Sequence, residues 1–536
     1  MHDVAPITSA RSDEMEEAAQ GKTQQQSKYD ILEKRTGMWR AIILSSLGKT
    51  LFPYSKFIRT LRLQDLEDLL DLLGDPKLKN LSSMFFMDEL GVFETKRKVK
   101  IQKKDILIVD AIQTSNRLTE VITKDTPMLE ELSGNIYHGT LSTCIPRLPK
   151  LQDLIVYGGE ALEDAGNLLC SYCPSFKSLK FYGWQHLNAD QHLATFLNDI
   201  RPNSLESFEI ISTSQIGAES FLALNCHRES LTELKLVGLK AEAIPSLSLL
   251  RGCTSLNSLS LAENGVATQD LEKRHNDVFL EVTAWLCACK ALQTITITKL
   301  LSATGILTPV LLENKIKLTK LELEGYLMSE SRDFHQALAS QISLQALWLK
   351  GESSDVGSDV DILVESLSKL ENLTDLRLRE ISDYFLDSHL CRLAQSLKKL
   401  ETWWTSGYAI TDAIWDDVAS LHDLRDLNLS AVTRFTADGI VNYILSLGAG
   451  NRGLILNVTM GDVDYQLSEE DQSMIKDTIN SHIGGRFDFM YFRGNEAKLR
   501  ASNVYLMSLQ IPRNQVSMEI QTETYKVVEV QALWKT

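Results

Sequence analysis

Residues 318–323 read LTKLEL, and the same pattern of apolar residues returns as LQALWL at 344–349 and LTDLRL at 373–378. Each phrase has an apolar residue at its first, fourth and sixth positions. Side chains of a strand alternate between two faces, so the fourth and sixth residues share one face and the fifth points to the other. The phrase therefore predicts a short strand with one buried face.

The phrase recurs along most of the chain. From 151 to 424 its copies begin about 27 residues apart on average, which is within the range of leucine-rich repeats. Between copies lie amphipathic stretches such as DSHLCRLAQSLKK (387–399), where apolar residues recur at helical spacing. One strand and one helix cannot bury an apolar face alone, so the units must stack. The clear copies begin at residues 151, 176, 205, 231, 256, 292, 318, 344, 373, 400 and 424, with weaker relatives at 58 and 129.

This repetition predicts an α/β leucine-rich-repeat solenoid with a parallel β-sheet on the concave face and helices on the convex face. The 36-residue step from 256 to 292 predicts an insertion at 265–282 that forms a longer outer helix. A last strand is expected at 453–460, a capping helix at 467–483 and another strand at 485–492. The expected domains are a disordered polar tail (1–28), a helical region with the first irregular repeats (29–128), the solenoid (129–452), a C-terminal cap (453–494) and a tail without assigned structure (495–536).

Composition excludes several classes of function. The net charge of −16 argues against a surface that binds nucleic acid and against attraction to anionic membranes. No apolar run approaches the ~20 residues that span a bilayer, and the acidic first twenty residues do not resemble a secretory signal. Eight cysteines are too sparse for a disulfide framework, which fits a reducing compartment. We expect a cytoplasmic or nuclear protein.

Two cysteine clusters, CSYC (170–173) and CAC (287–289), raise the alternative of a metal site. Cys173, Cys253 and Cys289 each stand three residues before the first apolar residue of a phrase, so their spacing follows the repeat, and we interpret them as small buried residues that close a helix. The sequence has no glycine-rich phosphate loop, nucleophile elbow or HExxH motif. We therefore expect no enzymatic activity, no metal and no cofactor.

The basic run KRKVKIQKK (96–104) has two interpretations. It is either a nuclear-localisation or anion-binding element, or, as is more common for such runs, a solvated loop or hairpin edge.

The fifth residue of each phrase points out of the sheet on the concave face, and two of these residues are tryptophans. Trp348, Arg377 and Trp404 occupy this position in three successive phrases, so we predict a ladder in which Arg377 lies between two indole rings. In KLETWWTSGY (399–408) the same register buries Trp403 and leaves Trp404 exposed. Lys350 and Arg379 form a basic strip beside the ladder, and Tyr408 lies near it.

Tryptophan, tyrosine and arginine dominate binding hot spots, and the arginine fork binds carboxylates or phosphates through two parallel hydrogen bonds. We therefore predict that Trp348, Lys350, Arg377, Arg379, Trp404 and Tyr408 bind a protein partner through an acidic or phosphorylated segment. The alternative is that these side chains shield one another and stiffen the sheet.

Several longer stretches are similar to the F-box/leucine-rich-repeat proteins of filamentous fungi, whose repeats are of the ribonuclease-inhibitor-like horseshoe type. The similarity covers roughly residues 29–490. The stretches that carry it include MWRAIILSSLGKTLFPYSKFIRTLRL (38–63), IPRLPKLQDL (145–154), RPNSLESFEIIS (201–212), GAESFLALNCHRESLTELKL (217–236), NDVFLEVTAWL (276–286), SDYFLDSHLCRLAQSLKKLETWWTSGYAITDAIWDDVASL (382–421), TADGI (436–440) and GRFDF (485–489).

This resemblance implies a substrate receptor of an SCF-type ubiquitin ligase, in which an F-box docks on the ligase adaptor and the solenoid holds the substrate. An F-box itself is not evident, because the 28 residues before Tyr29 are too few and too polar to form one. The expected function is a non-enzymatic protein-interaction protein with the SCF adaptor and cullin as further partners. The alternative is a stand-alone leucine-rich-repeat scaffold without ligase docking.

Overall fold

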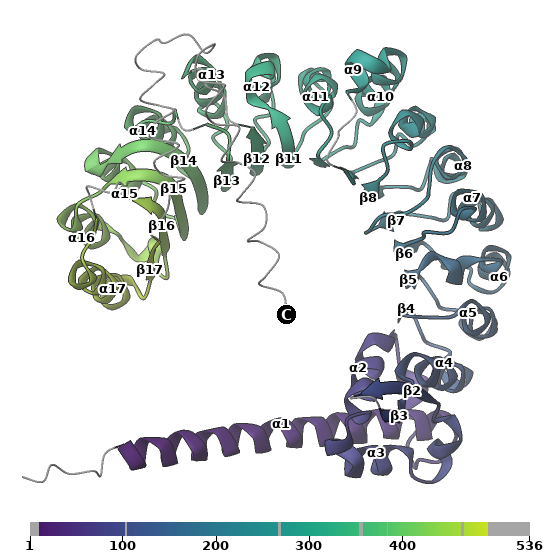
Figure 1. Ribbon diagram of the computed structural model, residues 1–536. Coiled ribbons are helices and arrows are strands. Elements are labelled where there is room, and N and C mark those ends of the chain that lie inside the picture. The colour runs from purple at the N-terminus through teal and green to yellow at the C-terminus, as the bar shows by residue number, and fades with distance from the viewer. Residues whose placement is uncertain are drawn as a thin grey trace, which may run out of the picture. The chain divides into compact units, whose positions relative to one another are not determined.

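The structure is a computed structural model that describes residues 10–101, 104–265, 270–352, 357–382, 384–461 and 466–490. It divides the chain into two compact units, residues 1–382 and 383–536. The fold is an α/β leucine-rich-repeat solenoid, as the sequence predicts, because parallel strands alternate with helices along the chain (Figure 1). The division between the units falls inside the stretch 129–452 that the sequence assigns to a single solenoid.

The sheet of the first unit follows the order of the chain. All of its neighbouring strands pair in parallel, so each strand lies beside those of the previous and the next repeat. The weaker phrases at 58 and 129 supply its first two strands. In order, the strands are β1 (Thr60–Arg62), β4 (Glu131–Gly134), β5 (Asp153–Gly158), β6 (Ser178–Gly183), β7 (Ser207–Ile210), β8 (Glu233–Leu239), β9 (Ser258–Glu263), β10 (Thr294–Thr298), β11 (Lys320–Leu327), β12 (Ala346–Glu352) and β13 (Asp375–Arg379).

The apolar positions of the phrase form the core. Leu321, Leu347 and Leu376 lie in register on β11, β12 and β13, and all three are fully buried. The outward residues between them remain partly accessible, which gives the alternation expected for a sheet with one buried face. Figure 1 shows the strands of this unit on the inner side of its curve and the helices on the outer side.

Helices that alternate with the strands of the first unit cover the buried face of its sheet. Most repeats contribute one helix, and the repeat of β8 instead has the long 3₁₀ helix η8 (Ile244–Gly252). The α-helices are α1 (Ala10–Ser46), α2 (Leu63–Leu73), α3 (Lys79–Phe86), α4 (Ala111–Ile122), α5 (His138–Cys144), α6 (Ala165–Tyr172), α7 (Ala189–Asp199), α8 (Ala218–Leu224), α9 (Leu271–Arg274), α10 (Asn276–Ala288), α11 (Ala303–Leu312), α12 (Arg332–Leu338) and α13 (Gly357–Leu367).

One backbone contact repeats between neighbouring turns of the solenoid. The carbonyl oxygen of Gln293 accepts the N–H groups of Thr319 and Lys320 at 2.8 and 3.1 Å. In the other repeats, too, one carbonyl oxygen accepts the two consecutive N–H groups at the start of the next strand, so these backbone groups are hydrogen-bonded. Its acceptors are the carbonyl groups of Arg59, Glu130, Gln152, Lys177, Glu206, Thr232, Asn257, Gln293, Thr319 and Gln345.

The N-terminal part of the first unit is helical, as expected. Helix α1 begins at Ala10, within the segment 1–28 for which the sequence predicts disorder, and residues 1–9 lie outside the described ranges. The basic run forms the antiparallel hairpin of β2 (Lys96–Ile101) and β3 (Lys104–Val109), which is the more common of the two interpretations. Lys96, Arg97, Lys98 and Lys100 are exposed on β2.

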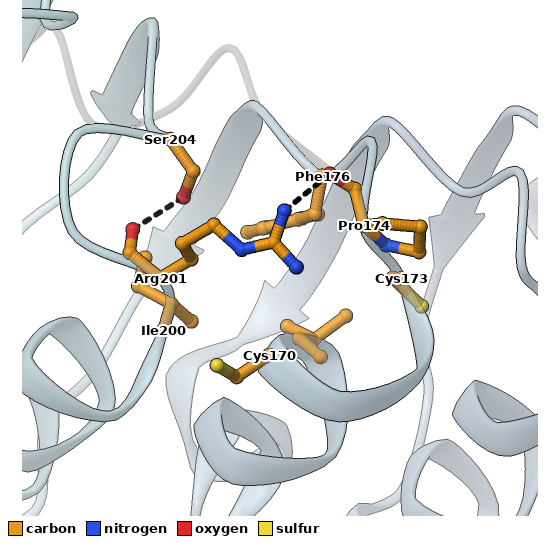
Figure 2. Close-up of a pocket in the computed structure, with 8 residues that line it drawn as sticks. Cys170, Cys173, Pro174, Phe176, Ile200, Arg201 and Ser204 are labelled. Atoms are coloured by element: carbon orange, nitrogen blue, oxygen red, sulfur yellow. Dashed lines mark hydrogen bonds between the residues drawn. The ribbon is translucent and has the colours of Figure 1, made fainter.

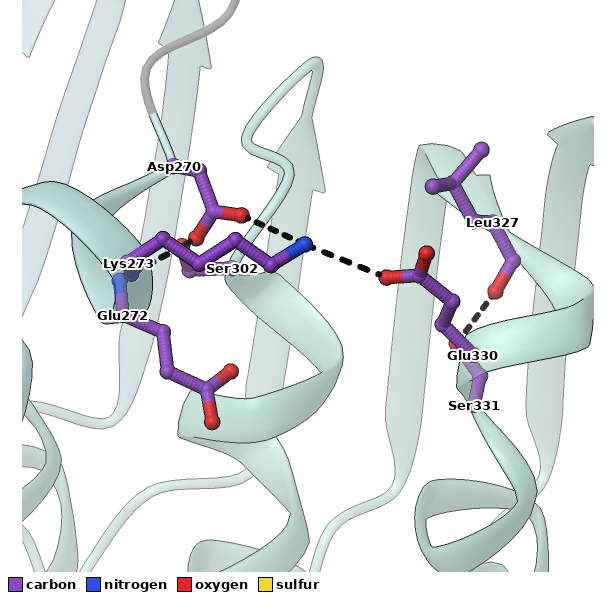
Figure 3. A network of polar contacts seen from close by, with 7 residues as sticks. All are labelled: Asp270, Glu272, Lys273, Ser302, Leu327, Glu330 and Ser331. Carbon is purple, nitrogen blue, oxygen red and sulfur yellow. Dashed lines mark hydrogen bonds and ion pairs between the residues drawn. The ribbon is translucent and has the colours of Figure 1, made fainter.

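The insertion after β9 forms two helices where the sequence predicts one. α9 and α10 are separated at His275, whose backbone is not helical, so the longer helix covers only the second part of the insertion. Asp270 caps α9 by accepting the Lys273 N–H at 3.2 Å, and the Ser302 hydroxyl donates to it at 3.0 Å. Figure 3 shows the Lys273 ammonium between Asp270 and Glu330, at 3.1 and 3.6 Å.

The second unit has four parallel strands among its described residues. They are β14 (Thr402–Thr411), β15 (Asp426–Arg434), β16 (Ile455–Gly461) and β17 (Arg486–Phe489). The helices are α14 (Asp387–Ser396), α15 (Trp415–Ala419), α16 (Ala437–Ser446) and α17 (Glu469–Ile483). β16, α17 and β17 lie where the sequence predicts the last strand, the capping helix and the final strand. The tail 495–536 lies outside the described residues.

None of the described helices combines the length and the apolar character needed to cross a bilayer.

Candidate partner-binding surface

The outward residues of β11, β12 and β13 form regular rows on the inner face of the first unit. The register places Trp348 beside Glu322 on one side and beside Arg377 on the other. The next row holds Glu324, Lys350 and Arg379. Trp348 therefore lies beside Arg377, and Lys350 lies beside Arg379, as the sequence predicts.

The half-buried Trp348 ring lies between two cations. The guanidinium carbon of Arg377 is 4.2 Å from the ring centroid, and the ammonium nitrogen of Lys320 is 3.9 Å from it. Both distances are typical of cation–π interactions. Lys320 is not among the site residues that the sequence predicts, although it stands two residues before Glu322 and so shares its face of the strand.

Each of these cations also has a carboxylate. Arg377 donates from Nε and Nη2 to the two oxygens of Asp375 at 2.9 and 3.0 Å. Lys320 pairs with Glu322 at 3.3 Å. We call these residues, Lys320, Glu322, Trp348, Asp375 and Arg377, the Trp348 cluster.

The neighbouring basic strip is paired as well. Lys350 donates to Glu324 at 3.0 Å, and this hydrogen bond is the main reason that the pKa of Lys350 is raised. Arg379 is exposed. The strip is therefore less positive than its sequence indicates, because strand neighbours supply the opposite charge.

Trp404 and Tyr408 belong to the second unit. The predicted positions of the two adjacent tryptophans, one buried and one pointing outward, are confirmed. Trp403 is 0% exposed, whereas Trp404 is half-buried and lies beside Asn428 in the register. The Trp404 indole donates to Asp426 at 3.2 Å. Tyr408 is half-buried, and its N–H donates to the carbonyl of Phe385 at 3.1 Å. The stacking of Arg377 on Trp404 stays a prediction, since the two residues belong to different units.

Three cysteines stand at the ends of helices. Cys173, Cys253 and Cys289 each follow the last residue of a helix and are buried, as the sequence predicts. Burial raises the pKa of each thiol to about 12, which disfavours the thiolate that acts as nucleophile or metal ligand. All eight cysteines are free.

A small pocket lies beside two of the cysteines, at the ends of α6 and α7. Cys170, Cys173 and Phe176 line it, and Arg201 reaches across it to the carbonyl of Pro174 at 3.4 Å (Figure 2). The space open to the centre of a water molecule is about 10 Å³, roughly one water position. Such a pocket is too small for a substrate.

No family model matches the chain, and no curated protein matches it either. Three solved structures are similar in fold at low identity. An internalin of Listeria monocytogenes is 14% identical, with 66% of this chain and 88% of the internalin covered and a TM-score of 0.37. A chain of the yeast Rad7–Elc1 complex is 13% identical, with 87% and 97% covered and a TM-score of 0.37. A chain of the TLR13–ssRNA13 complex is 14% identical, with 69% and 54% covered and a TM-score of 0.35. At such low similarity, none of these proteins bears on what this chain binds.

Proposed function

We propose that this chain is a non-enzymatic protein-interaction protein that holds a protein partner on the inner sheet face, with the Trp348 cluster as its anchor. The observation that carries the proposal is the half-buried Trp348 ring held between Lys320 and Arg377. Cations on both sides fix the ring in one position, so little side-chain freedom is lost when a partner packs against its edge. On the second unit, we propose Trp404 and Tyr408 as further partner-binding residues.

The partner segment is proposed to be acidic or phosphorylated. Arg377 already holds a carboxylate in a two-point geometry, which is the geometry that a partner carboxylate or phosphate requires. The partner has to compete with Asp375 for this fork. A phosphate competes better than a carboxylate because it carries more charge and more acceptor oxygens.

The experiment compares the proteins that co-purify with the wild-type chain and with two variants. The combination Arg377→Glu with Trp404→Ala reverses the charge of the fork and removes one proposed anchor, so partners of this surface should be lost. Arg251→Glu makes the same charge change at an exposed residue of η8 and serves as the matched control. An unchanged set of partners in the first variant would refute the proposal.

We further propose that the partner is a substrate of an SCF-type ubiquitin ligase. This role rests on the resemblance of residues 29–490 to F-box/leucine-rich-repeat proteins. Recovery of the ligase adaptor and cullin with the purified chain supports this receptor role. Recovery of other partners without the adaptor supports the alternative, a stand-alone scaffold.

A further inference from the structure

A second surface lies at the opposite end of the first unit, where α2 crosses the end of β4. Gly134, the last residue of β4, has φ +141°, and a Cβ there would meet the Leu63 Cβ at 2.6 Å. Only glycine allows this close approach. The contact fixes α2, and with it the side chains of the helix, beside the C-terminal ends of the first strands.

Three tyrosines lie at these strand ends. Tyr157 of β5 and Tyr182 of β6 contact each other with ring centroids 4.7 Å apart. Tyr137 follows β4, and the buried Asn116 of α4 fixes its backbone by accepting the Tyr137 N–H at 2.8 Å and donating to the carbonyl of Asn135 at 2.9 Å. Tyr137 and Tyr182 are 47% and 42% exposed, so two of the three rings are open to a partner.

Helix α2, which contacts β4, carries carboxylates that have no ion-pair partner among the described residues. Asp65, Asp68 and Asp71 are exposed, and among the described residues none of them, nor Glu67, forms an ion pair. Arg35 donates to the backbone carbonyl of Asp65, and Gln64 donates to the carboxylate of Asp68 at 2.5 Å. The negative charge of the helix is thus left unbalanced.

Glu67, on the buried side of α2, also lies among negative charges. Its side chain is 5% exposed, and its Oε1 has no hydrogen-bond partner among the residues that the structure describes. Burial, and then repulsion from Asp68 and Asp71, raises its pKa to about 7. The carboxylate is therefore held in a negative field that no cation of the described structure offsets.

The tyrosines and the acids are electrostatically coupled. Burial raises the pKa of Tyr157, and Tyr182 and the carboxylates of Glu67, Asp68 and Asp65 raise it further. Burial together with Asp110 and Glu67 likewise raises the pKa of Tyr137. We call Asp65, Asp68, Asp71, Tyr137, Tyr157 and Tyr182 the acid–tyrosine surface.

We propose that the acid–tyrosine surface docks a lysine- and arginine-rich segment of a partner protein. Carboxylates attract such a segment and pair with its cations, while tyrosine rings accept arginine or lysine over their faces. The Trp348 cluster offers no such carboxylates, because Glu322 and Asp375 already pair with Lys320 and Arg377 within the cluster. The two surfaces therefore bind different segments, and this proposal does not depend on the proposed function.

The test measures binding of a fluorescent peptide of alternating arginine and serine to the full chain by fluorescence anisotropy. The wild type should bind it, and Asp65→Asn with Asp68→Asn should bind about tenfold more weakly. Glu469→Gln with Glu470→Gln makes the same change in net charge at exposed residues of α17 and should bind as the wild type does. No binding by the wild type, or equal losses in both double variants, would overturn the proposal.

Two further measurements separate the aromatic contribution and the identity of the occupant. Tyr182→Ala should weaken binding several-fold and Tyr182→Phe should not, provided that circular dichroism shows both variants folded; equal binding by all three chains would overturn the role of the ring. Sedimentation tests whether a second copy of the chain binds the acid–tyrosine surface, since that copy would present the exposed basic strand β2. The proposal would be overturned by a dimer that the double substitution Asp65→Asn with Asp68→Asn dissociates and that the added peptide leaves intact.

Discussion

The Trp348 cluster and the acid–tyrosine surface are built from the same types of residue, aromatic rings and charges on one solenoid unit, but their charges are arranged differently. Around Trp348, Lys320 and Arg377 lie against both a carboxylate and the indole ring. On α2, carboxylates raise the pKa of the nearby Tyr157, and among the described residues no cation forms an ion pair with them. The first arrangement fixes a ring in place, and the second leaves an unbalanced charge that a partner can neutralise.

The largest expected effect concerns the glycine that supports the acid–tyrosine surface. Gly134→Ala adds a Cβ that collides with Leu63 and gives a side chain to a residue with positive φ. We expect the free energy of unfolding to fall by about 4 kcal/mol, measured by urea denaturation. Gly139→Ala, in α5 with nothing within 4 Å of the new Cβ, is the control and should be neutral or stabilising. Equal effects of the two substitutions would show that α2 does not pack on β4 this closely.

The next effect is a pH dependence of the same surface. The pKa of Glu67 is raised from 4.5 to about 7 in the folded protein, so the folded state binds the proton more tightly than the unfolded state. Stability is therefore lost as the pH rises from about 4.5 to about 7, by up to about 3 kcal/mol. Glu67→Gln should remove this loss, so the variant should exceed the wild type most clearly above pH 7. Parallel stability curves for the two proteins between these pH values would contradict the prediction.

A smaller effect is expected in the Trp348 cluster. Combining Trp348→Leu with Arg377→Met in a double-mutant cycle should give a coupling free energy of about 0.5–1 kcal/mol, the usual size of an exposed cation–π pair. Lys320→Met with Trp348→Leu should give a similar value, because Lys320 lies equally close to the ring. A coupling that is absent from both cycles would mean that the cations do not hold the ring.

The smallest effect concerns the ion pair beside the cluster. Lys350 and Glu324 are both more than one third exposed, so Glu324→Gln should lower the stability by less than about 0.5 kcal/mol. Concentrated salt should reduce the difference further, because it screens exposed charges. A loss that is larger, or that persists in salt, would show that this pair is not solvated as the structure has it.

The strands and their register follow from the repeated phrase, because a period of two determines which side chains face the core. This is why Trp403 and Trp404 could be assigned to opposite faces from their positions alone, and why Trp348 could be placed beside Arg377. The pairing of Arg377 with Asp375 could not be predicted in the same way, since it depends on which rotamers neighbouring long side chains adopt.

The acid–tyrosine surface is not visible in the repeat at all. It arises because α2 packs on Gly134, and α2 lies outside the regular phrases. The break of the inserted helix at His275 was likewise missed, because the sequence there has neither proline nor glycine to end a helix. Both features depend on contacts between segments that are distant in the sequence.

The carbonyl groups that each accept two N–H groups from the next repeat have a mechanical consequence. Every turn of the first unit is attached to its neighbour by the same short set of backbone bonds, and no bond of this set skips a turn. A pulling force along the stack is carried by all of these interfaces in series, and the terminal turn at β1, whose strand has a neighbour on one side only, is expected to detach first. Under tension the unit should lengthen in steps of one repeat, as a chain of similar links, and shorten again by adding repeats to those still folded.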